Sequence, residues 1–253
     1  MQHILKTGLW GLCLGIFLVC AQSGAALGGV QVVQGPTPIP NGDAQSAGDV
    51  TLSNDKLAVA FAVETGAPWG VARGGILDGA VVQDGEMELD HVTLIDFIPN
   101  NWSSWPTTYQ RVEVIQDTPE KGVVRTQRDW GQCDLVTTYT LRKGSDRMHM
   151  KTTMTNTGEK PEEDILSGYV LWCTGGSHFG PAGLAGREEG SRKGTMSDWS
   201  VTYDRDWAVT IHAPYFDHFD YEGRDLYLKH TLKPGESRIF EGWLQITPSG
   251  DLA

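Results

Sequence analysis

Residues 148–155 read Met-His-Met-Lys-Thr-Thr-Met-Thr, and this stretch decides the fold class. Met148, Met150, Thr152 and Met154 share one face, while the residues between them are polar or basic. Alternation with a period of two is the pattern of a β-strand that buries one face and leaves the other in water. The stretch therefore predicts a strand in a layered β structure.

Similar segments recur on both sides of this strand, separated by turns rich in Gly, Asn, Asp and Pro. No segment shows the sustained spacing of an amphipathic helix. This pattern predicts a single all-β domain over residues 49–253, built as a large two-sheet antiparallel β-sandwich. The predicted strands are residues 50–53, 57–63, 92–98, 110–115, 122–127, 134–141, 148–155, 165–172, 199–203, 207–212, 225–231 and 237–246.

The first 26 residues have the order of a secretory signal peptide. Lys6 precedes an uncharged, largely apolar run over 8–21, and small residues follow at 23–26. The run is shorter than a membrane-spanning helix needs, so we predict cleavage, no membrane span afterwards, and a periplasmic or secreted protein. Residues 27–48 are rich in Gly and Pro, which predicts a flexible linker.

The composition is that of an acidic globular protein. It holds 20 Lys and Arg against 32 Asp and Glu, a formal net charge of −12. This balance argues against a nucleic-acid partner, which would require a basic surface. Cys133 and Cys173 remain after removal of the predicted signal, and both a disulfide and two separate buried thiols are consistent with the sequence.

Two turns resemble those of a known fold family. Residues 153–161, Thr-Met-Thr-Asn-Thr-Gly-Glu-Lys-Pro, resemble a turn of the galactose mutarotase-like supersandwich, and residues 232–237, Leu-Lys-Pro-Gly-Glu-Ser, resemble its closing hairpin. That group includes aldose epimerases and accessory domains of carbohydrate-active enzymes. The resemblance implies a two-sheet β-sandwich that presents sugars to a concave face.

The sequence departs from the family where catalysis would lie. Epimerases of this group carry a catalytic His in the strand after the first turn, and residues 167–173 contain no His. They also need a carboxylate before the closing hairpin, where Asp225 is in the right neighbourhood without a matching motif. The resemblance therefore implies the fold more than the activity.

The segment 212–221 is the richest in chemically active side chains. His212 and His218, with Asp217 or Asp220, could bind a divalent metal or supply a general base with its orienting carboxylate. The spacing matches no known metal signature, so we expect no metal and no other cofactor. A strand end followed by a polar loop with aromatic residues is the structural alternative.

Tryptophan and asparagine in one loop indicate a carbohydrate platform. Trp102 and Trp105 lie beside Asn101 in a polar loop, where indole faces could stack on sugar rings and the amide could bond hydroxyls. His178, beside flexible glycines, could line a pocket. Core packing of the tryptophans and a hydrogen-bonded histidine are the structural alternatives.

These observations favour an exported, non-catalytic β-sandwich that binds carbohydrate or assists a partner enzyme. One alternative is a sugar epimerase, lyase or hydrolase on the same scaffold, with His212, His218 and Asp225 as catalytic candidates. Another is a structural protein of the cell envelope, whose partner would be an envelope component. The sequence leaves the oligomeric state open. The predicted ligand-binding residues are Trp102, Trp105, Asn101, His178, Tyr215 and Asp217.

Overall fold

The computed structural model describes residues 28–70, 73–102, 109–129, 131–180, 183–185 and 192–249. The predicted signal peptide lies outside these residues. The described chain is built from strands and two short 3-10 turns, η1 (Pro68–Gly70) and η2 (Tyr221–Gly223). The strands are β1 (Gln31–Gln34), β2 (Val50–Ser53), β3 (Leu57–Phe61), β4 (Ile76–Gln83), β5 (Glu86–Met87), β6 (Val92–Ile98), β7 (Tyr109–Thr118), β8 (Lys121–Asp129), β9 (Cys133–Arg142), β10 (Arg147–Asn156), β11 (Glu162–Cys173), β12 (Ser177–Gly180), β13 (Gly183–Ala185), β14 (Arg192–Asp204), β15 (Trp207–Asp220), β16 (Asp225–Leu232) and β17 (Ser237–Thr247).

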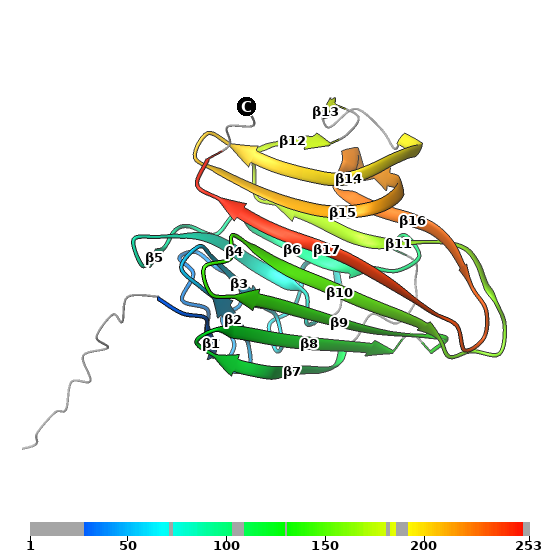
Figure 1. Cartoon of the computed structure of the whole chain (residues 1–253), viewed down its shortest axis with the longest axis horizontal. Coiled ribbons are helices and arrows are strands. Elements are labelled where there is room, and N and C mark those ends of the chain that lie inside the picture. The colour runs from blue at the N-terminus through cyan, green and yellow to red at the C-terminus, as the bar shows by residue number, and fades with distance from the viewer. Residues whose placement is uncertain are drawn as a thin grey trace, which may run out of the picture.

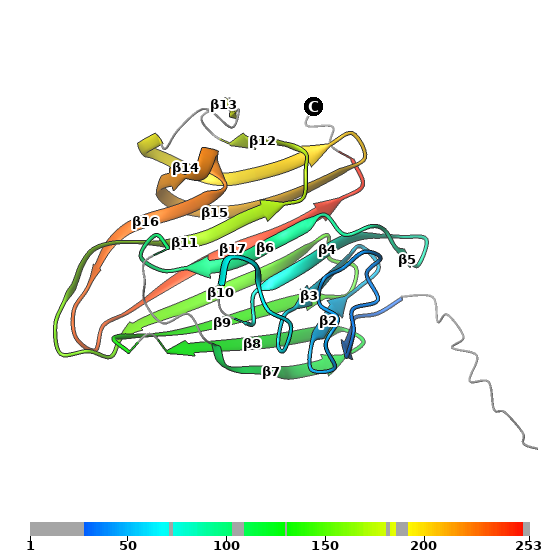
Figure 2. The same ribbon diagram turned by 180° about the vertical axis from the view of Figure 1, so that it is seen from behind.

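The strands form two antiparallel layers (Figure 1). The front sheet, nearest the viewer in Figure 1, has the order β7-β8-β9-β10-β17-β15-β14. The back sheet, nearest the viewer in Figure 2, has the order β1-β2-β3-β4-β6-β11-β16. The far end of β15 also pairs with β16 at residues 218–220, which joins the two layers. This arrangement is the predicted β-sandwich.

The main core fills the space between the sheets and follows the predicted alternation. Met148, Met150, Thr152 and Met154 are all fully buried, while the residues between them are half-buried or exposed. On the neighbouring strand β9, every second residue from Cys133 to Leu141 is buried in the same way. Because successive strand residues point to opposite sides, this pattern places one face of the front sheet in the core and leaves the other to solvent.

Residues 28–48 differ from the flexible linker that the sequence predicted. They form β1, which pairs with β2, and a turn that buries Ile39 and Ala44 against the outer side of β3 and β4. The Asp78 carboxylate fixes this turn by accepting hydrogen bonds from the amides of Asp43 and Ala44 at 2.6 and 3.1 Å. Gly and Pro mark turns correctly here, but the turns pack against the sheet.

The two turns that resembled the supersandwich lie against each other. The side chain of Asn156 is fully buried, and its amide group donates to the carbonyls of Lys160 and Leu232 at 2.8 and 2.9 Å. Its carbonyl oxygen accepts from the amide of Gly158, and its backbone bonds the turn before β17 at Glu236. One side chain therefore holds the β10–β11 turn against the β16–β17 hairpin.

Replacing Asn156 with alanine is expected to destabilise the protein by about 2–3 kcal/mol, because buried carbonyls lose their donors. Equilibrium denaturation in urea measures this change. Thr157→Ala, on the exposed side of the same turn, is the matched control and should cost less than about 1 kcal/mol. Equal effects of the two substitutions would contradict this role for Asn156.

Both cysteines outside the predicted signal peptide are free thiols in the structure. Burial raises the pKa of Cys133 and of Cys173 to about 12, so each is protonated at neutral pH. Among the described residues, no helix has the length and hydropathy that crossing a bilayer requires.

Candidate functional site

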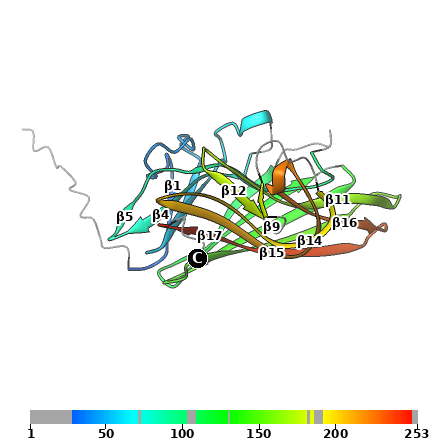
Figure 3. The same cartoon turned by 90° about the horizontal axis from the view of Figure 1, so that it is seen from above.

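A cluster of aromatic side chains covers the outer side of the back sheet. The sheet itself supplies an apolar floor that includes Leu94, Ile98, Val170 and Tyr227. Above this floor stand η1 and η2, which Figure 3 shows on the outer side of the back sheet. The aromatic cluster consists of Trp69 from η1, Trp102 after β6, Trp172 from β11 and Tyr221 from η2.

Each of the four rings contacts two of the others. Trp69 lies 5.2 Å from Trp172 and 6.4 Å from Trp102, measured between ring centroids. Tyr221 lies 5.5 Å from Trp172 and 6.4 Å from Trp102. Trp69 is 60% exposed and Tyr221 is 48% exposed, whereas the other two rings are half-buried. The cluster therefore offers two open rings supported by two partly buried ones.

A buried carboxylate holds the two half-buried indoles. Asp225, the first residue of β16, is fully buried and accepts three hydrogen bonds. The indole N–H of Trp102 donates to its Oδ2 at 2.5 Å, and that of Trp172 donates to its Oδ1 at 3.0 Å. The hydroxyl of Tyr227 donates to Oδ2 at 2.7 Å. Both carboxylate oxygens are thus used to position neighbouring rings.

Burial raises the pKa of Asp225 to about 7, although its three donors favour the charged form. The same burial and the nearby Asp225 charge raise the pKa of the Tyr227 hydroxyl well above its usual value. Tyr227 is therefore a permanent donor at neutral pH. Protonation of Asp225 near neutral pH would disturb its contacts with Trp102 and Trp172.

The backbone around the cluster adopts unusual conformations. Asn100, Asn101 and Trp102 follow one another with φ of 44°, 48° and 58°, and Trp69 and Tyr221 have φ of 55° and 48°. Positive φ is uncommon outside glycine and is a true outlier for a bulky residue. Such strain persists where the surroundings fix it, and it concentrates at functional sites. Three of the four rings in the aromatic cluster stand on such residues.

Polar groups border the rings. The guanidinium of Arg224 lies 5.1 Å from the Trp172 ring centroid. The amide of Asn101 donates to Asp220 Oδ2 at 3.4 Å, and Asp220 also accepts from the backbone amide of Tyr221. The edge of the aromatic cluster therefore carries an amide, a carboxylate and a guanidinium, each able to bond hydroxyl groups.

A second buried carboxylate lies in the same row of the back sheet. Val170 is paired with Asp225 on one side and with Asp96 on the other. Asp96 is fully buried, with its Oδ2 3.7 Å from Nη1 of Arg128, whose side chain is also fully buried. The guanidinium of Arg128 also donates to the carbonyl of Phe97. Because Arg128 belongs to the front sheet, this ion pair links the two layers beneath the site.

Comparison with solved structures returns proteins of the group that the two turns resembled. A galactose mutarotase-like protein from Lactobacillus casei is 10% identical, with 79% of this chain and 100% of that chain covered and a TM-score of 0.49. A putative aldose 1-epimerase from Escherichia coli is also 10% identical, with 78% and 97% covered and a TM-score of 0.45. An α-galactosidase of family GH36 from Geobacillus stearothermophilus is 12% identical, with 80% and 41% covered and a TM-score of 0.44.

These structures are similar to this chain in the path of the backbone, and no residue role is taken from them. No protein-family model matches the sequence, and no curated protein matches it. The chemistry of the site therefore rests on this chain's own residues.

The predicted site residues fall into separate places. Asn101, Trp102 and Asp225 come together in the site described above. His212 lies on the outer side of the front sheet, with its ring centroid 5.6 Å from that of Trp243. His218 contacts its neighbour Asp217, with Nδ1 2.8 Å from Oδ1. No hydrogen bond among the described residues joins either histidine to Asp225.

His178 is buried rather than open to a pocket. Its Nδ1 lies 2.8 Å from the hydroxyl of Thr202, and its Nε2 lies 3.1 Å from that of Ser200. Ser200 donates its proton to the carbonyl of Gly223, so Nε2 carries the histidine proton and Nδ1 accepts. Burial lowers the pKa of His178 to about 4. These contacts support the turn that carries Tyr221.

The remaining predictions are only partly covered by the structure. Trp105 and the side chain of Tyr215 lie outside the described residues. Among the described residues, no group of three or more His, Cys, Asp or Glu is arranged to hold a metal ion. Trp69 and Trp172 were not predicted as site residues, and Tyr221 was included only as the end of the segment 212–221, because the rings meet only through the strand order.

Proposed function

We propose that the aromatic cluster over Asp225 binds carbohydrate and that the chain is an exported, non-catalytic β-sandwich that recognises glycans or assists a partner enzyme. The observation that carries the proposal is the pair of exposed rings, Trp69 and Tyr221, held by rings that a buried carboxylate anchors. Export rests on the signal-like order of residues 1–26.

The chemistry of the site suits a sugar. An exposed indole or phenol face packs against the apolar C–H face of a pyranose, and preorganised rings lose little entropy when they bind. Asn101, Asp220 and Arg224 at the border provide donors and acceptors for hydroxyl groups. Exposed aromatic faces bordered by neutral and charged polar groups are the combination that sugar recognition requires.

Binding is favoured over catalysis by the environment of Asp225. A general acid or base must reach the substrate, but Asp225 is fully buried and both of its oxygens already accept hydrogen bonds. Its contacts are those of a positioning residue that orients Trp102 and Trp172.

Removing either exposed ring is expected to weaken sugar binding. In a glycan array followed by calorimetry with the best ligand, Trp69→Ala and Tyr221→Ala should each lower affinity at least about tenfold, because each removes a stacking surface. Val114→Ala, which removes an exposed apolar side chain from β7, is the control and should leave binding unchanged. An array without binding, or variants that bind as the original does, would refute the proposal.

An enzyme that acts on carbohydrate is the second candidate, and the raised pKa of Asp225 favours it. A carboxyl with pKa near 7 in an aromatic site is a common feature of general acids. This reading requires Asp225 to become accessible when ligand binds. Turnover of a sugar by the original protein, lost in Asp225→Asn with binding retained, would establish it.

A further inference from the structure

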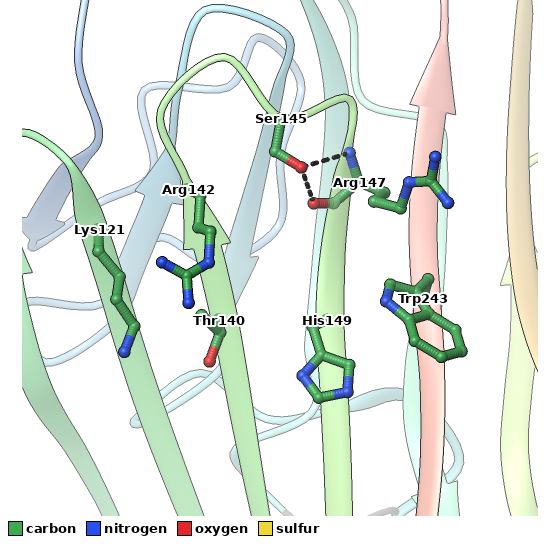
Figure 4. Close-up of a pocket in the computed structure, with 7 residues that line it drawn as sticks. All are labelled: Lys121, Thr140, Arg142, Ser145, Arg147, His149 and Trp243. Atoms are coloured by element: carbon green, nitrogen blue, oxygen red, sulfur yellow. Dashed lines mark hydrogen bonds between the residues drawn. The ribbon is translucent and has the colours of Figure 1, made fainter.

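A cavity lies on the side of the molecule opposite the aromatic cluster, on the outer side of the front sheet. It has a volume of about 530 Å³ and lies over β8, β9, β10 and β17 (Figure 4). Three of its lining residues are cations, Lys121, Arg142 and Arg147, and none is acidic. We call this the basic pocket. In a chain of net charge −12, a pocket lined only by cationic and neutral side chains is unexpected.

The cations lie side by side on adjacent strands. Lys121 is opposite Arg142 in the β8–β9 ladder, and Arg147 begins the next strand on the other side of the hairpin turn. Arg147 contacts Asp146, with Nε 3.3 Å from Oδ1, whereas Lys121 and Arg142 form no ion pair among the described residues. Adjacent strands are about 4.8 Å apart, so the three residues lie in a short row, in which Figure 4 shows the guanidinium of Arg147 turned toward β17.

A row of rings runs parallel to the cations: His149 lies two residues beyond Arg147 on β10, and Trp243 and His212 follow on the neighbouring strands β17 and β15. Thr140 is opposite His149, His149 opposite Trp243, and Trp243 opposite His212. The ring centroid of Trp243 lies 5.4 Å from that of His149 and 5.6 Å from that of His212. Figure 4 shows Thr140, His149 and Trp243 side by side, with Arg142 and Arg147 above them and Lys121 to the left. A step of two residues along a strand is about 7 Å.

The hairpin that carries two of the cations is held in place from the back sheet's side. The buried side chain of Asn54 donates to the carbonyls of Arg142 and Ser145, both at 2.8 Å. The amide of Gly144 donates to Asp55 Oδ1 at 3.2 Å. The turn is therefore fixed before any ligand arrives, which reduces the entropy cost of binding.

We propose that the basic pocket and the adjoining face of Trp243 bind an acidic glycan. Its carboxylate or sulfate groups would contact Lys121, Arg142 and Arg147, and its ring faces would stack on Trp243. Two parallel rows, one cationic and one aromatic, match a polymer whose every unit carries an anionic group beside an apolar ring face. The site is separate from the aromatic cluster over Asp225.

The surrounding charges favour this ligand over a nucleic acid. Glu241 lies beside the ring row, with Oε1 3.6 Å from Nε2 of His149 and 3.9 Å from Nζ of Lys151. A continuous phosphate backbone would meet this carboxylate and the negative field of the whole chain, since dense phosphate requires an extended basic surface. A glycan with fewer charges needs only the short cationic row.

Binding of three probes to the full chain tests the proposal: oligogalacturonate for carboxylates, a heparin oligosaccharide for sulfates, and a single-stranded oligodeoxynucleotide. We expect the protein to bind at least one of the two glycans, more weakly as salt is added. Arg142→Gln with Arg147→Gln should lower that affinity at least about tenfold, and Trp243→Ala should lower it about fivefold or more.

A control double variant removes two positive charges far from the basic pocket. Lys160→Gln with Lys233→Gln changes two exposed lysines at the opposite end of the sandwich and should leave glycan affinity within about twofold. Trp69→Ala should also leave it unchanged, so this proposal and the proposed function can fail separately. Failure of both glycans to bind, binding of the oligodeoxynucleotide in their place, or equal losses in the control pair would overturn the proposal.

Discussion

Replacing Arg128 with alanine is expected to destabilise the protein by about 3–5 kcal/mol. Arg128 and Asp96 are both fully buried, and breaking a buried ion pair from one side leaves a charge that water cannot reach. The substitution also removes the donor to the carbonyl of Phe97 and leaves a cavity between the sheets. Urea denaturation at neutral pH measures the loss.

The matched control lies three positions earlier on the same strand. Arg125 points to solvent and pairs with Glu113, with Nη2 2.5 Å from Oε2. A partly exposed pair of this kind contributes about 0–1 kcal/mol, so Arg125→Ala should change stability little. Similar losses of stability in Arg125→Ala and Arg128→Ala would contradict the expectation that burial sets the size of the loss.

A double variant separates the ion pair from the packing. Asp96→Leu combined with Arg128→Met removes both charges and keeps most of the volume, so it should recover much of the stability lost in Arg128→Ala. Losses that simply add would contradict the interpretation of Asp96 and Arg128 as one coupled pair.

The period of two identifies the strands that bury one face, whereas β4, which buries both faces, was not predicted. The alternation in 148–155 identifies β10 because one side of the front sheet is open to water. In β4 seven consecutive residues are buried, because residues 35–48 and the aromatic site cover the outer side of the back sheet. A strand without a solvent face has no period of two to detect.

The candidate site, like the strands, could be predicted from the sequence only in part. Asn101, Trp102 and Asp225 could be singled out one by one from their residue types and, for Asp225, from the family resemblance. Their meeting could not be predicted, since 123 positions separate Trp102 from Asp225. Trp69 and Tyr221 carry the exposed surface of the site. Tyr221 ends the segment 212–221 that the sequence distinguished, whereas nothing around Trp69 distinguishes it from a core residue. Strand order, which local pattern does not encode, brings these side chains together.

The fall in stability between about pH 4 and pH 7 is expected to be smaller in Asp225→Asn than in the original protein. The folded-state pKa of Asp225, about 7, lies above the ordinary 3.8, so the folded protein retains this proton longer than the unfolded chain. The stability that Asp225 contributes is therefore fully present below about pH 4 and is lost as pH rises through about 7. Asparagine does not titrate, so this component disappears.

Other buried groups also contribute to the dependence of stability on pH, and they are unchanged in Asp225→Asn. Burial raises the pKa of Asp78 to about 6 and that of Asp90 to about 7, which gives the same sign as Asp225. Burial lowers the pKa of His178 and of His230 to about 4, so stability from these two falls as pH drops below about 6.5. The difference between the two proteins, rather than either profile alone, isolates Asp225.

Tryptophan fluorescence provides the site-specific measurement. Protonation of Asp225 turns one acceptor oxygen into a donor that faces an indole N–H or the Tyr227 hydroxyl, so the surroundings of Trp102 or Trp172 must change. The original protein should show a one-proton fluorescence transition near pH 7 that is missing in Asp225→Asn. His91→Gln is the control, because His91 stacks on Trp207 at 4.4 Å and titrates separately. A transition that persists in Asp225→Asn and vanishes in His91→Gln would assign the proton to His91 and remove Asp225 as the group that sets the indoles.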